Sequence, residues 1–425
     1  MLPINIAIAG IGNVGQEVLK QLLNSKEFKD KFIIAGVSFK NKKKKRSINL
    51  SKFKFYKNPI DLAYDDKIDL VIELIGGEEG IAKDLSFACV RNKKAFVTAN
   101  KALIARHGLE LSRIAKKNKV FVGFEAAVAG CIPIIKVIKE SLISNEIHQI
   151  TGILNGTCNY LLDEIEKKSS KFEVVLKAAQ KLGYAEADPT FDIEGLDAAH
   201  KIIILSSLVF GEMPNLKNLY VKGVSDITLD DIRFANTFNY KIKLLGISYK
   251  NKNNFQCSVE PWLISNTHPL SKIEGVLNSI QINSDLCGPL IITGAGAGSK
   301  PTASSVLSDI HDFQMNTNRF GLFHKAILNK KNKINKTIPY KNILKFYMRI
   351  TVVDKSGVLA DITSIFKQNK ISIQSFFQDV KPDEKATDLI IITHQIDRKI
   401  MEKALKKIKQ LKGVVKQPVN LSIYD

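Results

Sequence analysis

The stretch from Gly183 to Lys201 holds the residues with the clearest potential for chemistry, because it is dense in carboxylates and ends in a lysine. Asp197 and Lys201 are four residues apart, so they share one face of a helix. The pair permits two interpretations. It could be a structural ion pair at the start of a helix, which is common. It could also be a lysine held by carboxylates in a pocket, able to donate or accept a proton near neutral pH.

The residues that follow predict the element that must position this lysine. An apolar segment from Ile202 to Leu205 continues toward Gly211, and such a run closed by glycine indicates a buried helix. Asp192 and Glu194 suit the N-terminal turn of that helix, where negative charge meets the positive end of the helix dipole. A lysine that leads into a buried helix needs a partner, since an isolated buried charge is costly.

A glycine-rich turn near the N-terminus indicates a dinucleotide site. The apolar run Ile4 to Ala9 leads into Gly10-Ile11-Gly12-Asn13-Val14-Gly15, after which a helical pattern begins. Glycines between a strand and a helix let backbone N–H groups approach a pyrophosphate. Further strands of a parallel sheet are expected at Phe32 to Val37, Asp69 to Ile75, Ala95 to Thr98 and Val120 to Phe124.

The end of the second expected strand bears on the choice of cofactor. A site that prefers NAD carries Asp or Glu there, but this chain has Ser38-Phe39-Lys40 and then a basic run to Arg46. We therefore expect NADP(H) to be preferred over NAD(H), with Lys40 or Arg46 meeting the 2′-phosphate. A solvated basic loop is the alternative.

The rest of the chain predicts two further domains. A strand at Gln149 to Leu154 precedes the polar turn Asn155 to Asn159, and a helix begins at Tyr160. The elements expected after it are a short strand at Val224 to Asp226, a helix near Leu229 to Thr237, strands near Lys241 to Ser248, Phe255 to Trp262, Ser279 to Ile282 and Leu290 to Ile292, and a helix from Ala303 towards His311. A β-α-β-β-α-β order at the C-terminal end predicts a ferredoxin-like module.

These patterns together predict an α/β protein of several domains. The division we expect is a Rossmann-type NADP-binding domain over 1–132 (completed by about 300–328), an α+β domain over 133–299 that contains the candidate catalytic residues, a linker over 329–342 and the ferredoxin-like module over 343–425.

Composition limits the class of protein. The net charge is +21, but the basic residues spread over the whole chain, so we expect no nucleic-acid partner. No apolar run is long enough to span a bilayer, and the chain enters a strand-like segment at once, so a cytoplasmic protein without a membrane partner is expected. The five cysteines are scattered, which predicts neither a disulfide framework nor a zinc site.

Taken together, these stretches resemble the homoserine dehydrogenase family, in the form with a C-terminal ACT domain. The matching segments are Gly10 to Gly15, Thr98 to Lys101, Asn155 to Thr157 with Asn159-Tyr160, Gly183 to Lys201, and Gly294 to Ser305. The resemblance implies NAD(P)-dependent interconversion of L-homoserine and L-aspartate 4-semialdehyde, in the biosynthesis of threonine, methionine and isoleucine.

The resemblance also implies roles for single residues. Lys201 resembles the family's proton donor and acceptor, and Lys101 resembles its lysine beside nicotinamide and substrate. Glu186 and Asp197 resemble the carboxylates that hold the substrate amino group and the catalytic lysine, while no role is implied for Cys158. The further implied contacts are Asn155, Gly156 and Thr157 for substrate, and Gly10, Ile11, Gly12, Asn13, Val14, Gly15, Gly76, Thr98, Asn100, Lys101, Gly183 and Gly298 for cofactor. The backbone carbonyls implied to bind a sodium ion are those of Glu125, Val128, Gly130 and Ile132.

The ACT resemblance implies feedback inhibition by L-threonine, and the middle domain is implied to pair in a homodimer. We expect removal of the residues after Asn342 to leave activity intact and to abolish the threonine response.

Two other classes of function are alternatives to the enzyme. A dinucleotide-sensing regulator without chemistry would not need Lys101, Glu186, Asp197 and Lys201. An RNA- or membrane-binding protein would rest on charge alone. A related enzyme with an aldehyde substrate is a closer alternative, in which Asn155 to Thr157 should differ.

Overall fold

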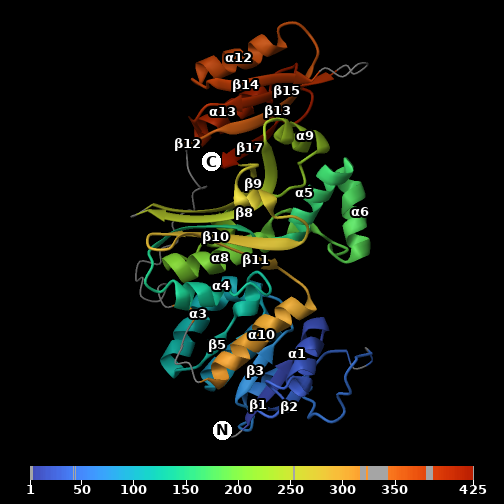
Figure 1. Ribbon diagram of the computed structural model, residues 1–425, viewed down its shortest axis with the longest axis vertical. Helices are drawn as coiled ribbons and strands as arrows, with labels where there is room; N and C mark the ends of the chain where they lie inside the picture. Colours follow the sequence, from blue (N-terminus) through green and yellow to red (C-terminus); the bar gives the residue numbers. More distant parts are fainter. Residues whose placement is uncertain are drawn as a thin grey trace.

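The computed structural model describes residues 3–41, 43, 45–251, 254–315, 322–323, 343–379 and 386–424. The molecule is elongated, with the N-terminal domain at one end, the C-terminal module at the other and a large sheet between them (Figure 1). The expected linker, 329–342, lies outside the described residues. Among the described residues, every helix is too short or too polar to span a bilayer.

The N-terminal domain is a five-stranded parallel sheet in the order β2-β1-β3-β4-β5. The strands are β1 (Ile4–Ala9), β2 (Phe32–Ser38), β3 (Leu70–Glu73), β4 (Ala95–Thr98) and β5 (Val122–Gly123). The helices around them are α1 (Asn13–Asn24), α2 (Ile81–Arg91), α3 (Lys101–Asn118) and α10 (Ser299–Gln314), and α10 packs against α1 (Figure 1). The expected Rossmann-type sheet is thus confirmed, and its carboxyl strand ends meet at one edge.

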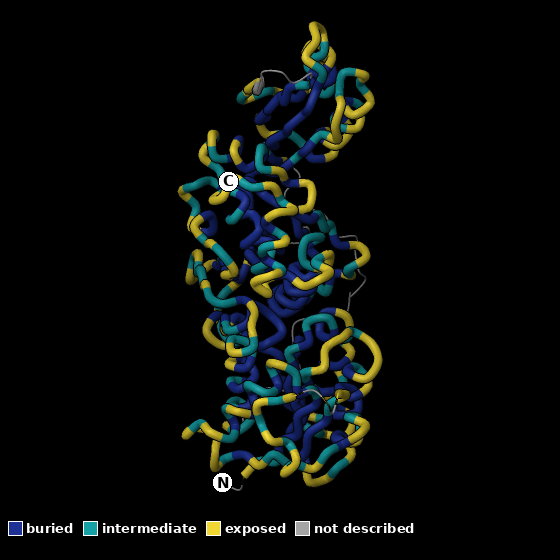
Figure 2. The backbone as a smooth tube through the Cα atoms, turned by 90° about the vertical axis from the view of Figure 1, so that its right-hand side faces the viewer, coloured by how far each residue is buried: buried dark blue, intermediate teal, exposed yellow. Residues whose placement is uncertain are grey.

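The central domain pairs β6 (Ile147–Ile153), β8 (Tyr240–Asn251), β9 (Asn254–Ser265), β10 (Leu277–Ser284) and β11 (Gly288–Ala295) in antiparallel ladders. Its helices include α5 (Gly156–Lys168), α6 (Phe172–Leu182), α8 (Leu196–Phe210) and α9 (Leu229–Thr237). Helix α8 is buried from Asp197 to Phe210, and Gly211 ends it with φ of +68°. Buried backbone runs along the middle of the molecule, with exposed segments at the periphery (Figure 2). The buried helix predicted from the apolar run is therefore present.

Three local predictions in this domain are wrong. Helix α5 begins at Gly156 and not at Tyr160, because the Asn155 side chain caps it and most of the expected polar turn forms its first turn. Helix α8 begins at Leu196, because Gly195 has φ of +82° and separates it from the four-residue helix α7 (Thr190–Ile193), which contains Asp192. The strand expected at Val224 to Asp226 is a turn, closed by the Ile227 N–H on the Val224 carbonyl at 3.0 Å, and the short strand β7 is Tyr220–Val221. In the last two cases a local turn interrupts the expected element.

The C-terminal module has the expected ferredoxin-like topology. Its elements are β13 (Phe346–Val353), α12 (Val358–Gln368), β14 (Ile373–Asp379), β15 (Ala386–Thr393), α13 (Arg398–Ile408) and β17 (Val419–Tyr424). The strands pair in the order β17-β13-β15-β14, and the short strands β12 (Ile343–Leu344) and β16 (Ile396–Asp397) pair with each other.

The module is not separate from the central domain. Strand β17 pairs in parallel with β9, with Ser422 opposite Trp262, so the two sheets form one. Trp262 is fully buried in a cluster that also contains Met348 and Phe366 of the module. Deleting the chain after Asn342 would leave β9 unpaired on this side from Trp262 to Ile264 and uncover this cluster. The structure therefore argues against the expectation that the truncated chain stays active.

Lys243 of β8 is a buried cation in the central domain. The residue is 2% exposed, and its Nζ donates to Asn159 Oδ1 at 2.9 Å and to the Ile273 carbonyl at 2.6 Å. Burial lowers the pKa of Lys243 from 10.5 to about 8, although Asp163 opposes the shift. The charged form of Lys243 is therefore disfavoured in the folded chain relative to the unfolded chain.

We expect the free energy of unfolding to rise between about pH 8 and pH 10 through Lys243. In this interval the unfolded chain holds a proton that the folded chain has released, and stability rises with pH wherever the unfolded state binds more protons. The contribution is up to about 3 kcal/mol at ~1.4 kcal/mol per pKa unit. Urea unfolding at several pH values should show a flatter profile for Lys243→Met than for the wild type or for Lys177→Met on the surface. Parallel profiles for all three proteins would contradict this assignment.

Candidate active site

A single carboxylate joins two lysines at the junction of the N-terminal and central domains. Lys201 Nζ lies 2.8 Å from Asp197 Oδ2, and Lys101 Nζ lies 2.9 Å from Asp197 Oδ1. Lys201 and Asp197 come from α8, while Lys101 is the first residue of α3. The side chains of Asp197 and Lys201 are 5% and 9% exposed, so the ion pair is buried rather than a surface pair.

Two of the three N–H groups of Lys201 have protein acceptors. One is Asp197, and the other is the Leu154 carbonyl at 2.7 Å, just after β6. A lysine ammonium has three donors, so one is left for an acceptor outside this set. The two bonds fix the direction in which that third donor points.

The charges of this cluster stabilise each other. Burial disfavours the Asp197 carboxylate, but Lys201 and Lys101 outweigh burial and hold the pKa of Asp197 well below its usual range. Burial likewise works against the Lys101 ammonium, but Asp197 outweighs it, so the pKa of Lys101 is raised. Lys101 therefore stays cationic at neutral pH, and its Nζ also lies 5.5 Å from the centre of the Phe191 ring.

A second carboxylate belongs to the site and was not predicted. Asn155 Nδ2 donates to Asp192 Oδ1 and to Asp197 Oδ2, both at 2.8 Å, and its Oδ1 caps α5 by accepting the Cys158 N–H at 2.7 Å. Burial raises the pKa of Asp192, opposed by the bond from Asn155. The sequence offered Asp192 only as a charge in the first turn of a helix. Its hydrogen-bond partner at the site, Asn155, lies 37 residues earlier in the chain.

The other predicted substrate residues surround this core. Thr157 Oγ1 donates to the Tyr184 carbonyl at 2.7 Å and lies 3.4 Å from Asp192 Oδ2. Gly156 is required by space, because a Cβ there would lie 2.5 Å from the Val276 carbonyl oxygen. Glu186 is exposed, and it acts on Lys101 only through electrostatic attraction. The structure thus brings Asn155, Thr157, Lys101, Asp197 and Lys201 together and leaves Glu186 at the rim.

The first glycine turn has the geometry that a pyrophosphate needs. Gly10 has φ of +104°, and a Cβ there would lie 2.5 Å from the Leu74 carbonyl, while a Cβ on Gly15 would lie 2.1 Å from the Gly10 oxygen. No side chain among the described residues caps α1, which begins at Asn13. Backbone N–H groups at a helix start with no side-chain cap fit an anionic ligand.

Of the two residues predicted to meet the 2′-phosphate, Arg46 lies beside this turn and Lys40 follows β2. Arg46 Nε donates to the Ile11 carbonyl at 3.1 Å, and its guanidinium lies 4.2 Å from the centre of the Phe39 ring. Lys40 is exposed, two residues after the end of β2. Arg46 is therefore held against the glycine turn.

A buried carboxylate connects the other predicted cofactor residues. Glu73 accepts the N–H groups of Ile75 and Gly76 at 2.7 and 2.9 Å, and the Thr98 hydroxyl at 2.6 Å. Asn100 donates from Nδ2 to the Gly77 carbonyl at 2.6 Å and caps α3 through Oδ1. The carboxyl ends of β3 and β4 are thereby fixed to each other, directly before Lys101.

The loop predicted to hold sodium lies against the second glycine-rich turn. Ala129 and Gly130 have positive φ, and the Cys131 N–H donates to the Ala295 carbonyl at 3.1 Å. The Gly130 carbonyl accepts the Ser305 hydroxyl at 2.7 Å, and the Ile132 carbonyl accepts the Ile134 N–H at 2.8 Å. A carbonyl oxygen has two lone pairs, so these bonds are compatible with a cation ligand in addition.

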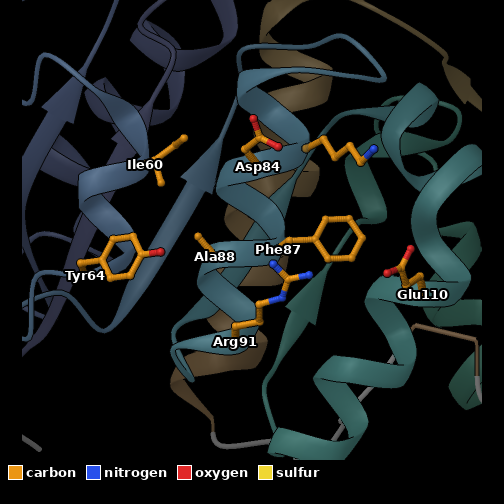
Figure 3. Close-up of a pocket in the computed structure, with 8 residues that line it drawn as sticks. Ile60, Tyr64, Asp84, Phe87, Ala88, Arg91 and Glu110 are labelled. Carbon is orange, nitrogen blue, oxygen red and sulfur yellow. The ribbon is translucent and has the colours of Figure 1, made fainter.

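A shallow hollow elsewhere on the N-terminal domain is separate from these residues (Figure 3). It has a volume of about 440 Å³ and lies between α2, α3 and the short helix at Pro59–Ala63, with Phe87 and Arg91 on one side and Tyr64 on the other. None of its lining residues is one of the predicted site residues.

The chain matches three family profiles in the order that the structure shows. They are "Homoserine dehydrogenase, NAD binding domain" over residues 10–125, "Homoserine dehydrogenase" over 133–311 and "ACT domain" over 346–413. A homoserine dehydrogenase of Neisseria gonorrhoeae is 38% identical over 99% of this chain and 98% of its own length. The chain belongs to the homoserine dehydrogenase family. It is accordingly an NAD(P)-dependent oxidoreductase that acts on a CH–OH group, in the form with an ACT domain.

Solved structures of homoserine dehydrogenases share the whole fold. One from Thiobacillus denitrificans is 36% identical, with a TM-score of 0.89 over 100% of this chain and 98% of its own. One from S. aureus is 30% identical with a TM-score of 0.78, over 100% of this chain and 99% of its own. A hyperthermophilic archaeal homoserine dehydrogenase in complex with NADPH is 25% identical, with a TM-score of 0.64 over 75% of this chain and 99% of its own. The resemblance inferred from the motifs is therefore confirmed for family and fold.

Proposed function

We propose that this family member interconverts L-homoserine and L-aspartate 4-semialdehyde, with Lys201 as the proton donor and acceptor. The observation that carries the proposal is the buried Lys101–Asp197–Lys201 cluster, at the junction between the glycine-turn domain and the central domain. The reaction is one step in the supply of threonine, methionine and isoleucine. The wild-type and Lys201 assays set out in the Discussion test it.

The cluster has the charges that this substrate requires. Homoserine carries an ammonium group, which suits the carboxylates of Asp192, Asp197 and Glu186, and a hydroxyl that must lose a proton on oxidation. In the reduction direction the Lys201 ammonium donates its third proton to the substrate oxygen, and in the oxidation direction the neutral Lys201 amine accepts the hydroxyl proton at the same position. Lys101 adds positive charge beside it. When bound, the nicotinamide accepts or supplies the hydride.

We further propose that NADP(H) is held by the predicted cofactor residues. They include Gly10 to Gly15, Lys40, Arg46, Gly183 and Gly298. In the same proposal the carbonyls of Glu125, Val128, Gly130 and Ile132 would hold a sodium ion and so order their loop. The hydrogen bond from the Cys131 N–H to the Ala295 carbonyl, which joins this loop to the glycine-rich turn, supports a structural role for the loop.

We expect the double variant Lys40→Ala, Arg46→Ala to lose most of its preference for NADP over NAD. A charge-assisted contact to the 2′-phosphate is worth roughly 1.5–3 kcal/mol, so the ratio of kcat/KM values should fall by about tenfold or more. The measurement is kcat/KM for homoserine oxidation with each cofactor. Lys57→Ala, an exposed lysine outside the glycine turn, is the control. An unchanged ratio in the double variant would remove both residues from cofactor selection.

The module after the linker is proposed to bind L-threonine and to inhibit the enzyme. Its fusion to the central sheet through β9 and β17 supports transmission of an effector signal, since a ligand that favours one arrangement of β17 also acts on β9. Threonine titration of wild-type turnover checks the proposal, and a flat titration would contradict it. A homodimer, cytoplasmic location and the stated domain boundaries stay predictions from the sequence.

A further inference from the structure

Asn278 is a buried side chain for which the motifs implied no role. It lies on β10 opposite Gly294 of β11, and it is 0% exposed. Its Nδ2 donates to the Leu154 carbonyl at 3.0 Å, the same oxygen that accepts from Lys201 Nζ at 2.7 Å. Asn278 therefore contacts the group that holds the lysine, without contacting the lysine.

The glycine-rich turn after β11 keeps Asn278 in place. A Cβ on Gly296 would lie 2.0 Å from Cγ of Asn278, 2.2 Å from its Oδ1 and 2.3 Å from its Nδ2. The amide of Asn278 thus fills the space that any side chain at position 296 would need. The absence of a side chain at position 296 therefore lets the Asn278 amide take the position from which Nδ2 reaches the Leu154 carbonyl.

Strand pairing places the Leu154 carbonyl beside Asn278. Leu154 follows β6, whose Ile153 pairs with Ser279, the neighbour of Asn278 on β10. Two donors on one carbonyl oxygen use both of its lone pairs. The direction of the bond from Lys201 is then set by the oxygen position that Asn278 defines.

We propose that Asn278 is a positioning residue for the proton-transfer lysine, and that it connects the glycine-rich turn at 294–298 to that lysine through the Leu154 carbonyl. The inference rests on the role of Lys201 proposed above. Asn278 fixes one of the two protein bonds of Lys201, and Asp197 fixes the other. Together they aim the third N–H at the substrate oxygen.

The first test is structural and needs no cofactor. In a crystal structure of cofactor-free Asn278→Ala, the Leu154 carbonyl should turn and the Lys201 Nζ contact should exceed 3.5 Å, the limit of a hydrogen bond. Ser279→Ala, which changes the neighbouring buried residue on β10, should keep the contact. An unchanged Lys201–Leu154 bond in Asn278→Ala would overturn the proposal. Asn278→Leu keeps a similar volume and has no donor, so it gives the same answer should the alanine variant fail to fold.

The second test is a double-mutant cycle on turnover. Asn278→Ala should lower kcat about tenfold or more, raise the solvent isotope effect on kcat, and leave the KM for cofactor within about twofold. Added to Lys201→Ala, it should cause no further loss, because it acts through the lysine. The role of Asn278 would be refuted if Asn278→Ala lowered kcat by the same factor in the wild type and in Lys201→Ala. It would also be refuted if Asn278→Ala had the same kcat as Ser279→Ala. Full activity of Lys201→Ala would instead refute the proposed function.

Discussion

Replacing Lys201 with alanine is expected to lower kcat for homoserine oxidation by at least about a hundredfold, the lower end of the range for loss of a general acid–base group. The Lys201 amine is the group that accepts the hydroxyl proton, at the one nitrogen position that its bonds to Asp197 and Leu154 leave open. Its removal also leaves Asp197 with one lysine instead of two, so the loss includes part of the charge balance. The KM for the cofactor should change little, because the glycine turn is untouched.

Steady-state kinetics of Lys201→Ala and Lys201→Met measure this effect, with circular dichroism to confirm folding. Methionine keeps most of the apolar volume of lysine, so it separates loss of the amine from loss of packing. Lys181→Ala on α6, where the side chain is exposed, is the matched control and should behave like the wild type. Turnover of both Lys201 variants near the wild-type rate would show that another group moves the proton.

Replacing Arg398 with methionine is expected to lower the free energy of unfolding by about 3–5 kcal/mol, the cost of removing one partner of a buried pair. Arg398 begins α13, and its two terminal nitrogens lie 2.9 and 3.0 Å from the oxygens of Glu260 on β9. Both side chains are at most 6% exposed. Burial raises the pKa of Glu260 and Arg398 opposes the rise, so without Arg398 the carboxyl would lose its main cation.

Urea unfolding of Arg398→Met against the wild type measures this loss. Arg233→Met is the control. The Arg233 side chain is 60% exposed and its Nη1 lies 3.9 Å from Asp230 Oδ1, and such surface pairs contribute little to the free energy of unfolding. A double variant, Arg398→Met with Glu260→Met, should recover part of the loss, since no charge is then buried without a partner. If Arg398→Met lowered the free energy of unfolding by less than about 1 kcal/mol, the contact between the central domain and the C-terminal module would not depend on this pair.

The elements that the sequence predicted are those whose signal is local. A strand, a glycine turn and a helix follow one another within Ile4–Asn24. The apolar pattern indicates the strand and the helix, and the glycines indicate the turn. The same is true of α8, where an apolar run ends at a glycine, and of the β-α-β-β-α-β order of the module. Asp197 and Lys201 could be paired in advance because they are one helical turn apart.

The features that the sequence did not predict depend on contacts between distant segments. Asp192 meets Asn155 only because α7 returns to the start of α5, and nothing near Asp192 in the chain indicates this. Strands β9 and β17 each have an ordinary strand pattern, and no residue marks them as partners. Glu260 and Arg398 are 138 residues apart, so their pairing depends on that same sheet contact.

The most direct test of the central claim is the appearance of reduced cofactor when L-homoserine is added to the purified chain with NADP⁺ or NAD⁺. We expect homoserine-dependent reduction that is faster with NADP⁺ than with NAD⁺ and at least about a hundredfold slower in Lys201→Ala. No reduction with either cofactor by folded wild-type protein would contradict the account.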